Sequence, residues 1–227
     1  MAHKFTLTKA DRVRIGTAVT AAEAQTSGEI VTIITDQSDS YGDWALIWSA
    51  VVALMALVAL SIAPEFYIAQ IDRVMGWWSA EWPPRALFTL AAIVATIKFV
   101  GMRLILLWQP LLLWLTPKPV KQARVRLRAL TCFRVGTEKR TTGSTGVLIY
   151  LSRAERRAEI VTESSISAKI SPEVWGAAMA ALLSHIKQGH VADGMIDAIA
   201  QVGVVLAEHF PRDADDVNEL PDRLIEV

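Results

Sequence analysis

The sequence predicts an α/β protein, specifically a Rossmann-like α/β/α sandwich that is interrupted by a two-helix transmembrane hairpin. Two apolar runs, Trp44–Ala63 and Ala86 to about Trp108, each reach the roughly 20 residues that a helix needs to cross a bilayer. On both sides of these runs, short β-branched segments alternate with longer helical patterns, as in layered α/β proteins. About 150 of the 227 residues lie outside the runs, which is enough for one compact domain.

The chain therefore divides into three stretches. Residues 1–43 are expected to form the first part of the α/β domain, residues 44–116 the hairpin, with spans at about 44–63 and 86–108, and residues 117–227 the second part. The mean hydropathy of +0.34 is high for a soluble domain, and the two apolar runs account for the excess.

The first part begins with a helix. Thr8 and Asp11 have the spacing of a capping box, and the helix that follows is expected to end at Gly28. The segment Glu29–Thr35 (EIVTIIT) is short and β-branched, which predicts a buried strand. A polar loop over residues 36–43 then leads directly into the first apolar run.

The second part repeats this alternation. Ser171 followed by Pro172 is typical of a helix start. The predicted elements, in order, are a helix over 120–140, a turn over 141–146, a strand over 147–151, a turn over 152–156, a return strand over 157–162, a helix from 171 to 188 and a last helix over 192–209.

The hairpin makes the topology of the two main strands predictable. The helix over 120–140 leaves the membrane and carries the chain to the far edge of the sheet, so the strands over 29–35 and 147–151 should be parallel and adjacent. Their carboxyl ends would then face the bilayer. Because open α/β sheets bind ligands beyond those ends, Asp36, Asp39 and the turn over 152–157 are expected to share a crevice near the lipid surface.

Charged residues around the apolar runs predict the orientation. Basic residues precede the first run and follow the second, whereas the loop over 64–84 carries Glu65, Asp72 and Glu81 against Arg73. The positive-inside bias places both termini and the α/β domain in the cytoplasm, and Trp108 and Trp114 suit the inner interface. Lys98 lies within the second span. Since neither span contains a carboxylate, we interpret it as snorkelling toward the headgroups rather than as part of an ion pathway.

Acidic residues follow the first strand. Asp36, Asp39 and Asp43 are candidate ligands for Ca²⁺ or Mg²⁺, because hard cations bind clustered oxygen ligands on loops. The alternative interpretation is a solvated turn, in which aspartate and serine are common.

A compact charged turn follows the second strand. Arg153, Arg156 and Arg157, together with Glu155, form either a solvated hairpin or a site for an anion or a lipid headgroup. The formal net charge of zero argues against nucleic acid as a partner. The single cysteine, Cys132, fits a small buried hydrophobe in a helix, and one cysteine excludes an intramolecular disulfide.

Several motifs outside the runs resemble the TPM domain family. They are TSGEIVTII (26–34), TGVLIYLSRAERRAEIV (145–161), ISPEVW (170–175), GHVADGMIDAI (189–199), AEHFP (207–211) and NELPDRLIE (218–226). The chain is most similar to bacterial membrane proteins in which a transmembrane hairpin splits this domain. Look-alikes usually carry a glycine at the position of Ser165, and well-known members have a signal peptide, which this sequence lacks.

The resemblance implies an α/β/α Rossmann-like fold, together with weak acid-phosphatase activity and calcium binding that are reported for some members. It does not identify a catalytic residue in this sequence. We expect a multi-pass protein of the bacterial inner membrane that contacts lipid and an integral membrane protein or complex. It would act as an accessory module in assembly or maintenance of membrane proteins. The alternative is a divalent-metal-assisted phosphatase that acts on phosphoesters near the membrane.

Overall fold

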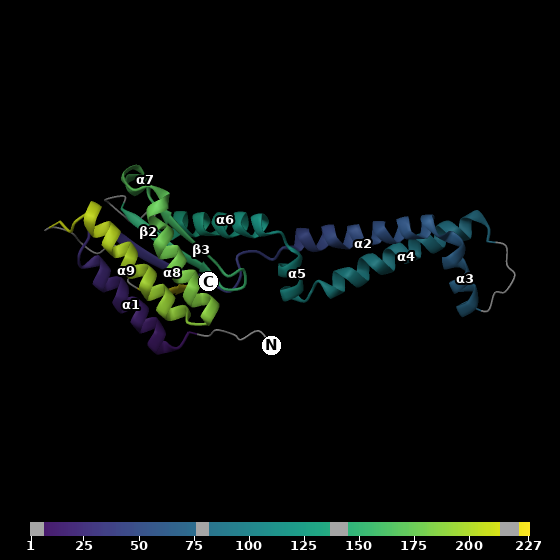
Figure 1. Cartoon of the computed structure of the whole chain (residues 1–227), viewed down its shortest axis with the longest axis horizontal. Helices are drawn as coiled ribbons and strands as arrows, with labels where there is room; N and C mark the ends of the chain where they lie inside the picture. The colour runs from purple at the N-terminus through teal and green to yellow at the C-terminus, as the bar shows by residue number, and fades with distance from the viewer. Residues whose placement is uncertain (1–6, 76–81, 137–144, 214–222) are drawn as a thin grey trace. The chain divides into compact units, whose positions relative to one another are not determined.

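The computed structural model describes residues 7–75, 82–136, 145–213 and 223–227. The chain separates into two compact units (Figure 1). One comprises residues 1–39 and 118–227, and the other comprises residues 40–117. Each unit is described by itself.

The first unit contains a four-stranded mixed sheet. Its strands are β1 (Glu29–Thr35), β2 (Gly146–Ser152), β3 (Arg157–Thr162) and β4 (Ile225–Glu226), in the order β3-β2-β1-β4. β1 and β2 are parallel, with a register that runs from Glu29 opposite Gly146 to Thr35 opposite Ser152. β3 returns antiparallel to β2. The parallel pair and the return strand confirm the topology predicted from the sequence, whereas β4 was not predicted.

One face of the sheet is covered by α1 (Lys9–Glu23), α7 (Ser164–Lys169), the 3₁₀ helix η1 (Pro172–Trp175), α8 (Gly176–Gln188) and α9 (Val191–His209). Apolar side chains of these helices pack with Ile30, Ile34, Ile149 and Leu151 in one buried cluster. This cluster is the main core of the α/β unit.

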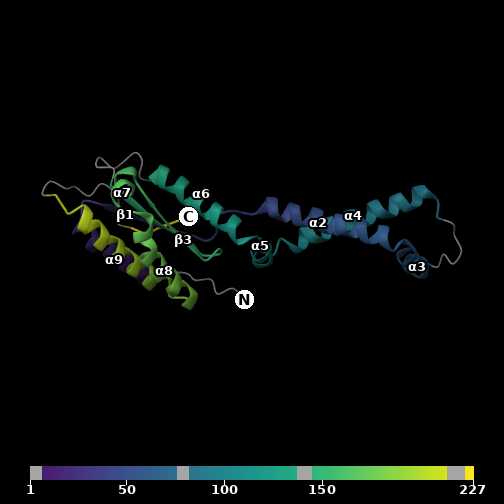
Figure 2. The ribbon, with the colours of Figure 1, turned by 45° about the horizontal axis from the view of Figure 1, so that its top comes forward.

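The other face of the sheet is covered by α6 (Lys118–Gly136), which lies opposite α8 and α9 (Figure 2). Val125, Ala129 and Phe133 on α6 pack against Leu148 and Tyr150 of the sheet. Helices therefore cover both faces, which explains why β1 and β2 are buried along their whole length.

The predicted capping box of the first helix is confirmed. The Thr8 side chain accepts a hydrogen bond from the backbone N–H of Asp11 at 3.1 Å, and the Asp11 carboxylate accepts one from the backbone N–H of Thr8 at 3.0 Å. The helix ends at Glu23, earlier than the predicted end at Gly28.

One other helix prediction needs correction, and one lies partly outside the described residues. The segment that starts at Ser171 opens as the 3₁₀ helix η1, in which the Ser171 side chain makes no capping bond, and α8 follows from Gly176. α6 is described to Gly136, so its predicted end at Arg140 lies outside the described residues, as does most of the turn predicted over 141–146.

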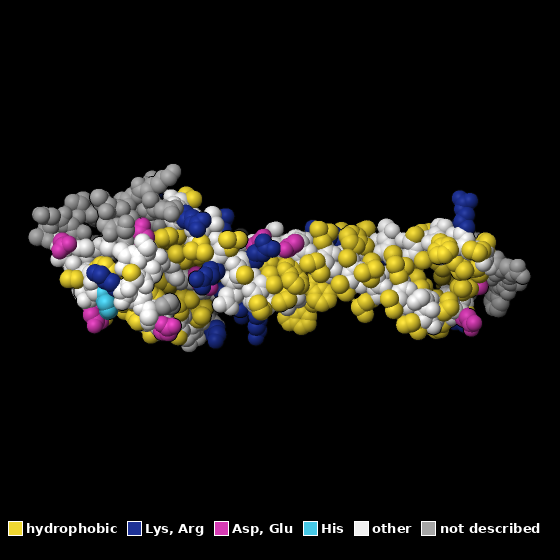
Figure 3. Space-filling model, turned by 90° about the horizontal axis from the view of Figure 1, so that it is seen from above, with side chains coloured by type: hydrophobic (Ala, Val, Ile, Leu, Met, Phe, Trp, Pro, Cys, Tyr) yellow, Lys and Arg dark blue, Asp and Glu magenta, His cyan; other side chains and the backbone are white. Residues whose placement is uncertain are grey.

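The second unit contains α2 (Gly42–Ile62), α3 (Pro64–Met75), α4 (Pro84–Ile105) and α5 (Gln109–Leu115). α2 and α4 are long and apolar enough to cross a membrane, and only 11% and 0% of their most apolar windows are buried. Both helices are therefore largely exposed in the structure. Their hydrophobic side chains lie on the surface of this unit (Figure 3). α3 was not predicted, because residues 64–84 were expected to form a loop.

Candidate functional site

The carboxyl ends of β1 and β2 bring two separate segments of the chain together. Thr35 and Ser152 are partners in the parallel register. Beyond them, the backbone N–H of Arg153 donates to the carbonyl of Thr35 at 3.0 Å, and that of Ala154 donates to the carbonyl of Asp36 at 2.9 Å. The loop after β1 and the turn after β2 are therefore neighbours, as the sequence predicted. We name this region, residues 35–39 and 152–157 with the facing side chains of α6, the charged edge.

Glu155 connects the two segments of the charged edge through hydrogen bonds. It is only 8% exposed, and its carboxylate accepts a hydrogen bond from the backbone N–H of Ser38 at 2.9 Å and another from the Ser152 hydroxyl. The hydroxyls of Ser38 and Tyr150 lie 3.0 Å apart, and burial raises the pKa of the Tyr150 phenol. The backbone of Arg156 has a φ of 51°, in the left-handed region, which lets the turn close over Glu155.

The three predicted metal ligands have different surroundings. Asp36 forms an ion pair with Arg153, Asp39 forms one with Arg124 at 3.2 Å, and Asp43 lies in the first turn of α2 in the other unit. Within the described ranges, no three Asp, Glu, His or Cys side chains are grouped so that they could hold a metal ion. Binding of Ca²⁺ or Mg²⁺ stays a prediction, which a titration must test.

The predicted anion-binding arginines take different positions. Arg153 pairs with Asp36, Arg157 donates to the backbone carbonyl of Lys118 at 3.3 Å, and Arg156 is exposed. An arriving phosphate or carboxylate would have to compete with Asp36 for Arg153, because guanidinium groups bind both kinds of anion in the same forked geometry.

Positive charge is concentrated where α6 begins. The pKa of Lys121 is lowered, first by burial and then by the positive charges of Arg157 and Lys118, while Glu155 opposes this effect. Burial is the largest cause, and the two neighbouring cations add to it. Lys118, Lys121 and Arg124 are among the basic residues that follow the second apolar run, and the sequence predicted only the orientation of the hairpin from them. Their spacing of three residues on a helix was the signal that they share one face.

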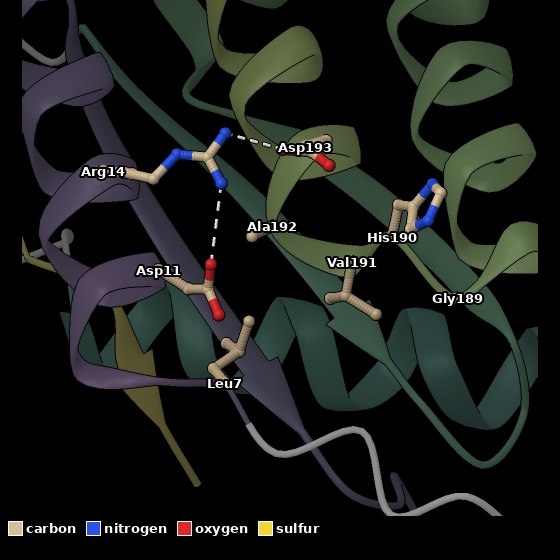
Figure 4. A pocket seen from close by; sticks show the side chains of 8 residues that line it. All are labelled: Leu7, Asp11, Arg14, Gly189, His190, Val191, Ala192 and Asp193. Atoms are coloured by element: carbon tan, nitrogen blue, oxygen red, sulfur yellow. Dashed lines mark hydrogen bonds and ion pairs between the residues drawn. The ribbon is translucent and has the colours of Figure 1, made fainter.

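Other cavities of the α/β unit lie away from the charged edge, and two of them contain charged side chains. One of about 210 Å³ lies between the first turns of α1 and α9 (Figure 4). Its charged groups are already paired, since Arg14 contacts Asp193 at 2.6 Å and Asp11 at 3.6 Å. The other, of about 390 Å³, follows the edge strand β3, where burial raises the pKa of Glu159 and the positive charge of Arg126 partly offsets the rise. Neither cavity brings together residues that the sequence singled out as candidate ligands.

Comparisons with known proteins agree with the predicted resemblance. Residues 122–205 match the model of the TPM domain family. No curated protein sequence matches the chain. The fold is similar to the NMR structure of the BA42 protein from the psychrophilic bacterium Bizionia argentinensis, with a TM-score of 0.56 and 19% sequence identity over 100% of this chain and 99% of that one. The family match and the shared fold confirm the resemblance to TPM domains.

Proposed function

We propose that this protein is a membrane-anchored binding or accessory module of the TPM type. In this proposal α2 and α4 cross a bacterial inner membrane as a hairpin, and the α/β unit is a Rossmann-like sandwich on the cytoplasmic side. The charged edge contacts lipid headgroups or a loop of an integral membrane protein. The module would then assist the assembly or maintenance of membrane proteins.

The observation that carries the proposal is the exposure of large apolar side chains on α2 and α4. Leu54, Met55 and Phe88 are 61%, 66% and 76% exposed. Leaving such a side chain in water forgoes about 1.5–3 kcal/mol of burial free energy. Soluble monomers rarely expose contiguous apolar patches beyond a few hundred Å². A bilayer removes this cost for both helices at once.

Charge supports the cytoplasmic orientation. α6 follows the hairpin with six basic residues and no acidic one, namely Lys118, Lys121, Arg124, Arg126, Arg128 and Arg134. Basic residues within about 20 residues of a span remain on the cytoplasmic side.

Connectivity supports a role for the charged edge at the membrane. Residues 36–41 alone separate β1 from α2, and they come directly from this edge. On the return path, Thr116 and Pro117 alone separate α5 from α6, whose first residue accepts the hydrogen bond from Arg157. The two segments that connect the hairpin with the α/β unit therefore both meet the α/β unit at the charged edge.

Carbonate extraction of membranes tests the anchoring. The full chain should stay in the pellet, whereas Leu54→Arg/Val58→Arg should be lost from it, because an arginine at the centre of a span costs about 2.5–3.5 kcal/mol. Leu54→Ile/Val58→Leu is the matched control and should behave like the unchanged protein. Release of the unchanged protein into the supernatant would contradict the proposal.

The alternative function is a divalent-metal-assisted phosphatase in which Asp36 and Asp39 hold the cation. It predicts hydrolysis of p-nitrophenyl phosphate by the purified protein that requires Ca²⁺ or Mg²⁺ and disappears in Asp36→Asn/Asp39→Asn. Since both carboxylates already have arginine partners, we expect no turnover above the buffer blank. Metal-dependent turnover that the double variant abolishes would replace the accessory role with an enzymatic one.

A further inference from the structure

The outer face of α6 is basic and carries exposed apolar side chains. Its inner face, with Val125, Ala129 and Phe133, is buried against the sheet. The arginines Arg126, Arg128 and Arg134 are exposed, and so are Leu127 and Val135, which are 60% and 80% accessible. The helix is therefore apolar on the side that builds the core and cationic with scattered large hydrophobes on the outer side.

Two acidic groups reach α6, and one of them interacts with an arginine of the outer face. Asp39 pairs with Arg124, and Glu159 of β3 interacts with Arg126 from the sheet side. Over its 19 residues α6 has no acidic side chain of its own. Arg128 and Arg134 are exposed, and the ion pairs within 4.0 Å among the described residues do not include them.

We propose that the outer face of α6 binds the headgroups of anionic phospholipids. The α/β unit would then contact the bilayer with the side of the sheet that α6 covers. The inference rests on the proposed membrane anchoring. Juxtamembrane basic residues attract anionic lipid, and exposed leucine or valine between them enters the headgroup region.

The position of α6 in the chain favours lipid over other polyanions. The helix begins shortly after the candidate span α4, with α5 between them, and Trp108 and Trp114 at the two ends of α5 are 65% and 77% exposed. Exposed tryptophans beside a span are typical of the bilayer interface. Nucleic acid is less suitable, because the net charge of zero provides no long-range attraction.

The short range of electrostatic attraction in salt limits how α6 can lie on the bilayer. Arg126 and Arg134 lie eight residues apart, which is about 12 Å along the helix axis at about 1.5 Å per residue, whereas the Debye length at physiological salt is about 8 Å. Only a helix that lies along the surface brings all three exposed arginines within that range. Each arginine near the surface then raises the equilibrium constant for docking about fivefold, so the three together raise it on the order of a hundredfold.

The experiment uses the full chain in lipid nanodiscs. Thr131→Cys in a Cys132→Ser background carries a polarity-sensitive fluorophore on the exposed face of α6. The discs contain phosphatidylcholine alone or mixed with phosphatidylglycerol, and a lipid labelled in its headgroup region serves as quencher. We expect a blue shift and quenching only with phosphatidylglycerol, and reversal at high salt.

Matched charge variants test the residues. Arg126→Gln/Arg128→Gln/Arg134→Gln should abolish the lipid-dependent signal. Lys9→Gln/Lys169→Gln/Lys187→Gln removes the same charge from exposed positions on α1, α7 and α8 and should leave the signal unchanged.

Equal signals in the two kinds of disc would overturn the inference, and so would loss of the signal in the control triple variant. If poly-glutamate shifts the probe in phosphatidylcholine discs while phosphatidylglycerol does not, the face binds an acidic polypeptide instead and the lipid assignment is wrong. Carbonate extraction separates the two proposals, because a pelleted protein with an unresponsive probe contradicts only the lipid inference.

Discussion

Removing the Glu155 carboxylate should loosen the charged edge measurably. In Glu155→Ala, the Ser38 N–H and the Ser152 hydroxyl lose a common buried acceptor. In Glu155→Gln, one carbonyl oxygen remains, so one acceptor is retained without its charge. The exposed residue Glu208 on α9 provides the matched controls, Glu208→Ala and Glu208→Gln.

The expected magnitude follows from the two hydrogen bonds. Bonds to a charged group contribute about 1.5–3 kcal/mol each, and relief of the buried charge returns part of that sum. We therefore expect Glu155→Ala to lower the free energy of unfolding by about 3 kcal/mol and Glu155→Gln by about 1.5 kcal/mol. For a unit of this size, each kcal/mol lowers Tm by about 2–4 °C.

The native thiol provides the assay. Cys132 is the only cysteine in the sequence, it packs against the cluster beneath α6, and burial raises its pKa. Because the thiolate is the reactive form, a fluorogenic maleimide should label the folded protein slowly and the unfolded protein quickly. A Tm of Glu155→Ala within 1–2 °C of that of Glu208→Ala, a shift equivalent to about 0.5 kcal/mol, would refute the proposed role of Glu155.

Two further predictions concern packing and pH. Gly194→Ala places its Cβ 2.7 Å from the Cβ of His185 and 3.1 Å from the carbonyl oxygen of Leu182, so the same assay should show a loss of about 1–3 kcal/mol, whereas Gly176→Ala, with nothing within 4 Å, should show no loss. Equal Tm values for the two glycine variants would contradict the close approach of α8 and α9. The raised pKa of Glu159, caused mainly by burial, means that the folded state holds this proton more tightly than the unfolded state. The contribution of Glu159 to stability therefore falls as pH rises above 4.5, the ordinary pKa of this group. A plot of Tm against pH should be flatter for Glu159→Gln than for the unchanged protein.

Local patterns in the sequence were sufficient to predict the two parallel strands whose ends form the charged edge. The β-branched run from Glu29 to Thr35 identified β1, and the hairpin that follows it implied a parallel neighbour. Parallel pairing then required Asp36 and Arg153 to lie at one edge, where they form an ion pair.

The partners within the edge were not predictable in the same way. The pairing of Asp39 with Arg124 depends on how α6 rotates against the sheet, which the burial of Val125, Ala129 and Phe133 decides. In the sequence, Glu155 was interpreted as one charge of a compact turn that is either a solvated hairpin or a site for an anion or a lipid headgroup. Glu155 is buried, and the next residue, Arg156, has a left-handed backbone, which arginine does not signal in a sequence.

Short or composite elements escaped the sequence analysis for a different reason. β4 has only two residues, Ile225 and Glu226, too few to show alternation, and its pairing with β1 depends on chain that returns from the far end of the sequence. α3 mixes apolar and charged residues directly after an apolar run, so its start at Pro64 was interpreted as a loop boundary.

Cysteine accessibility tests the central claim of a cytoplasmic domain on a transmembrane hairpin most directly. In a Cys132→Ser background, Glu65→Cys lies on α3 between the two candidate spans, and Glu208→Cys lies on α9 of the α/β unit. An impermeant maleimide added to intact bacterial spheroplasts should label Glu65→Cys, and it should label Glu208→Cys only after the membrane is permeabilised. Labelling of both positions without permeabilisation, or of neither, would contradict the account.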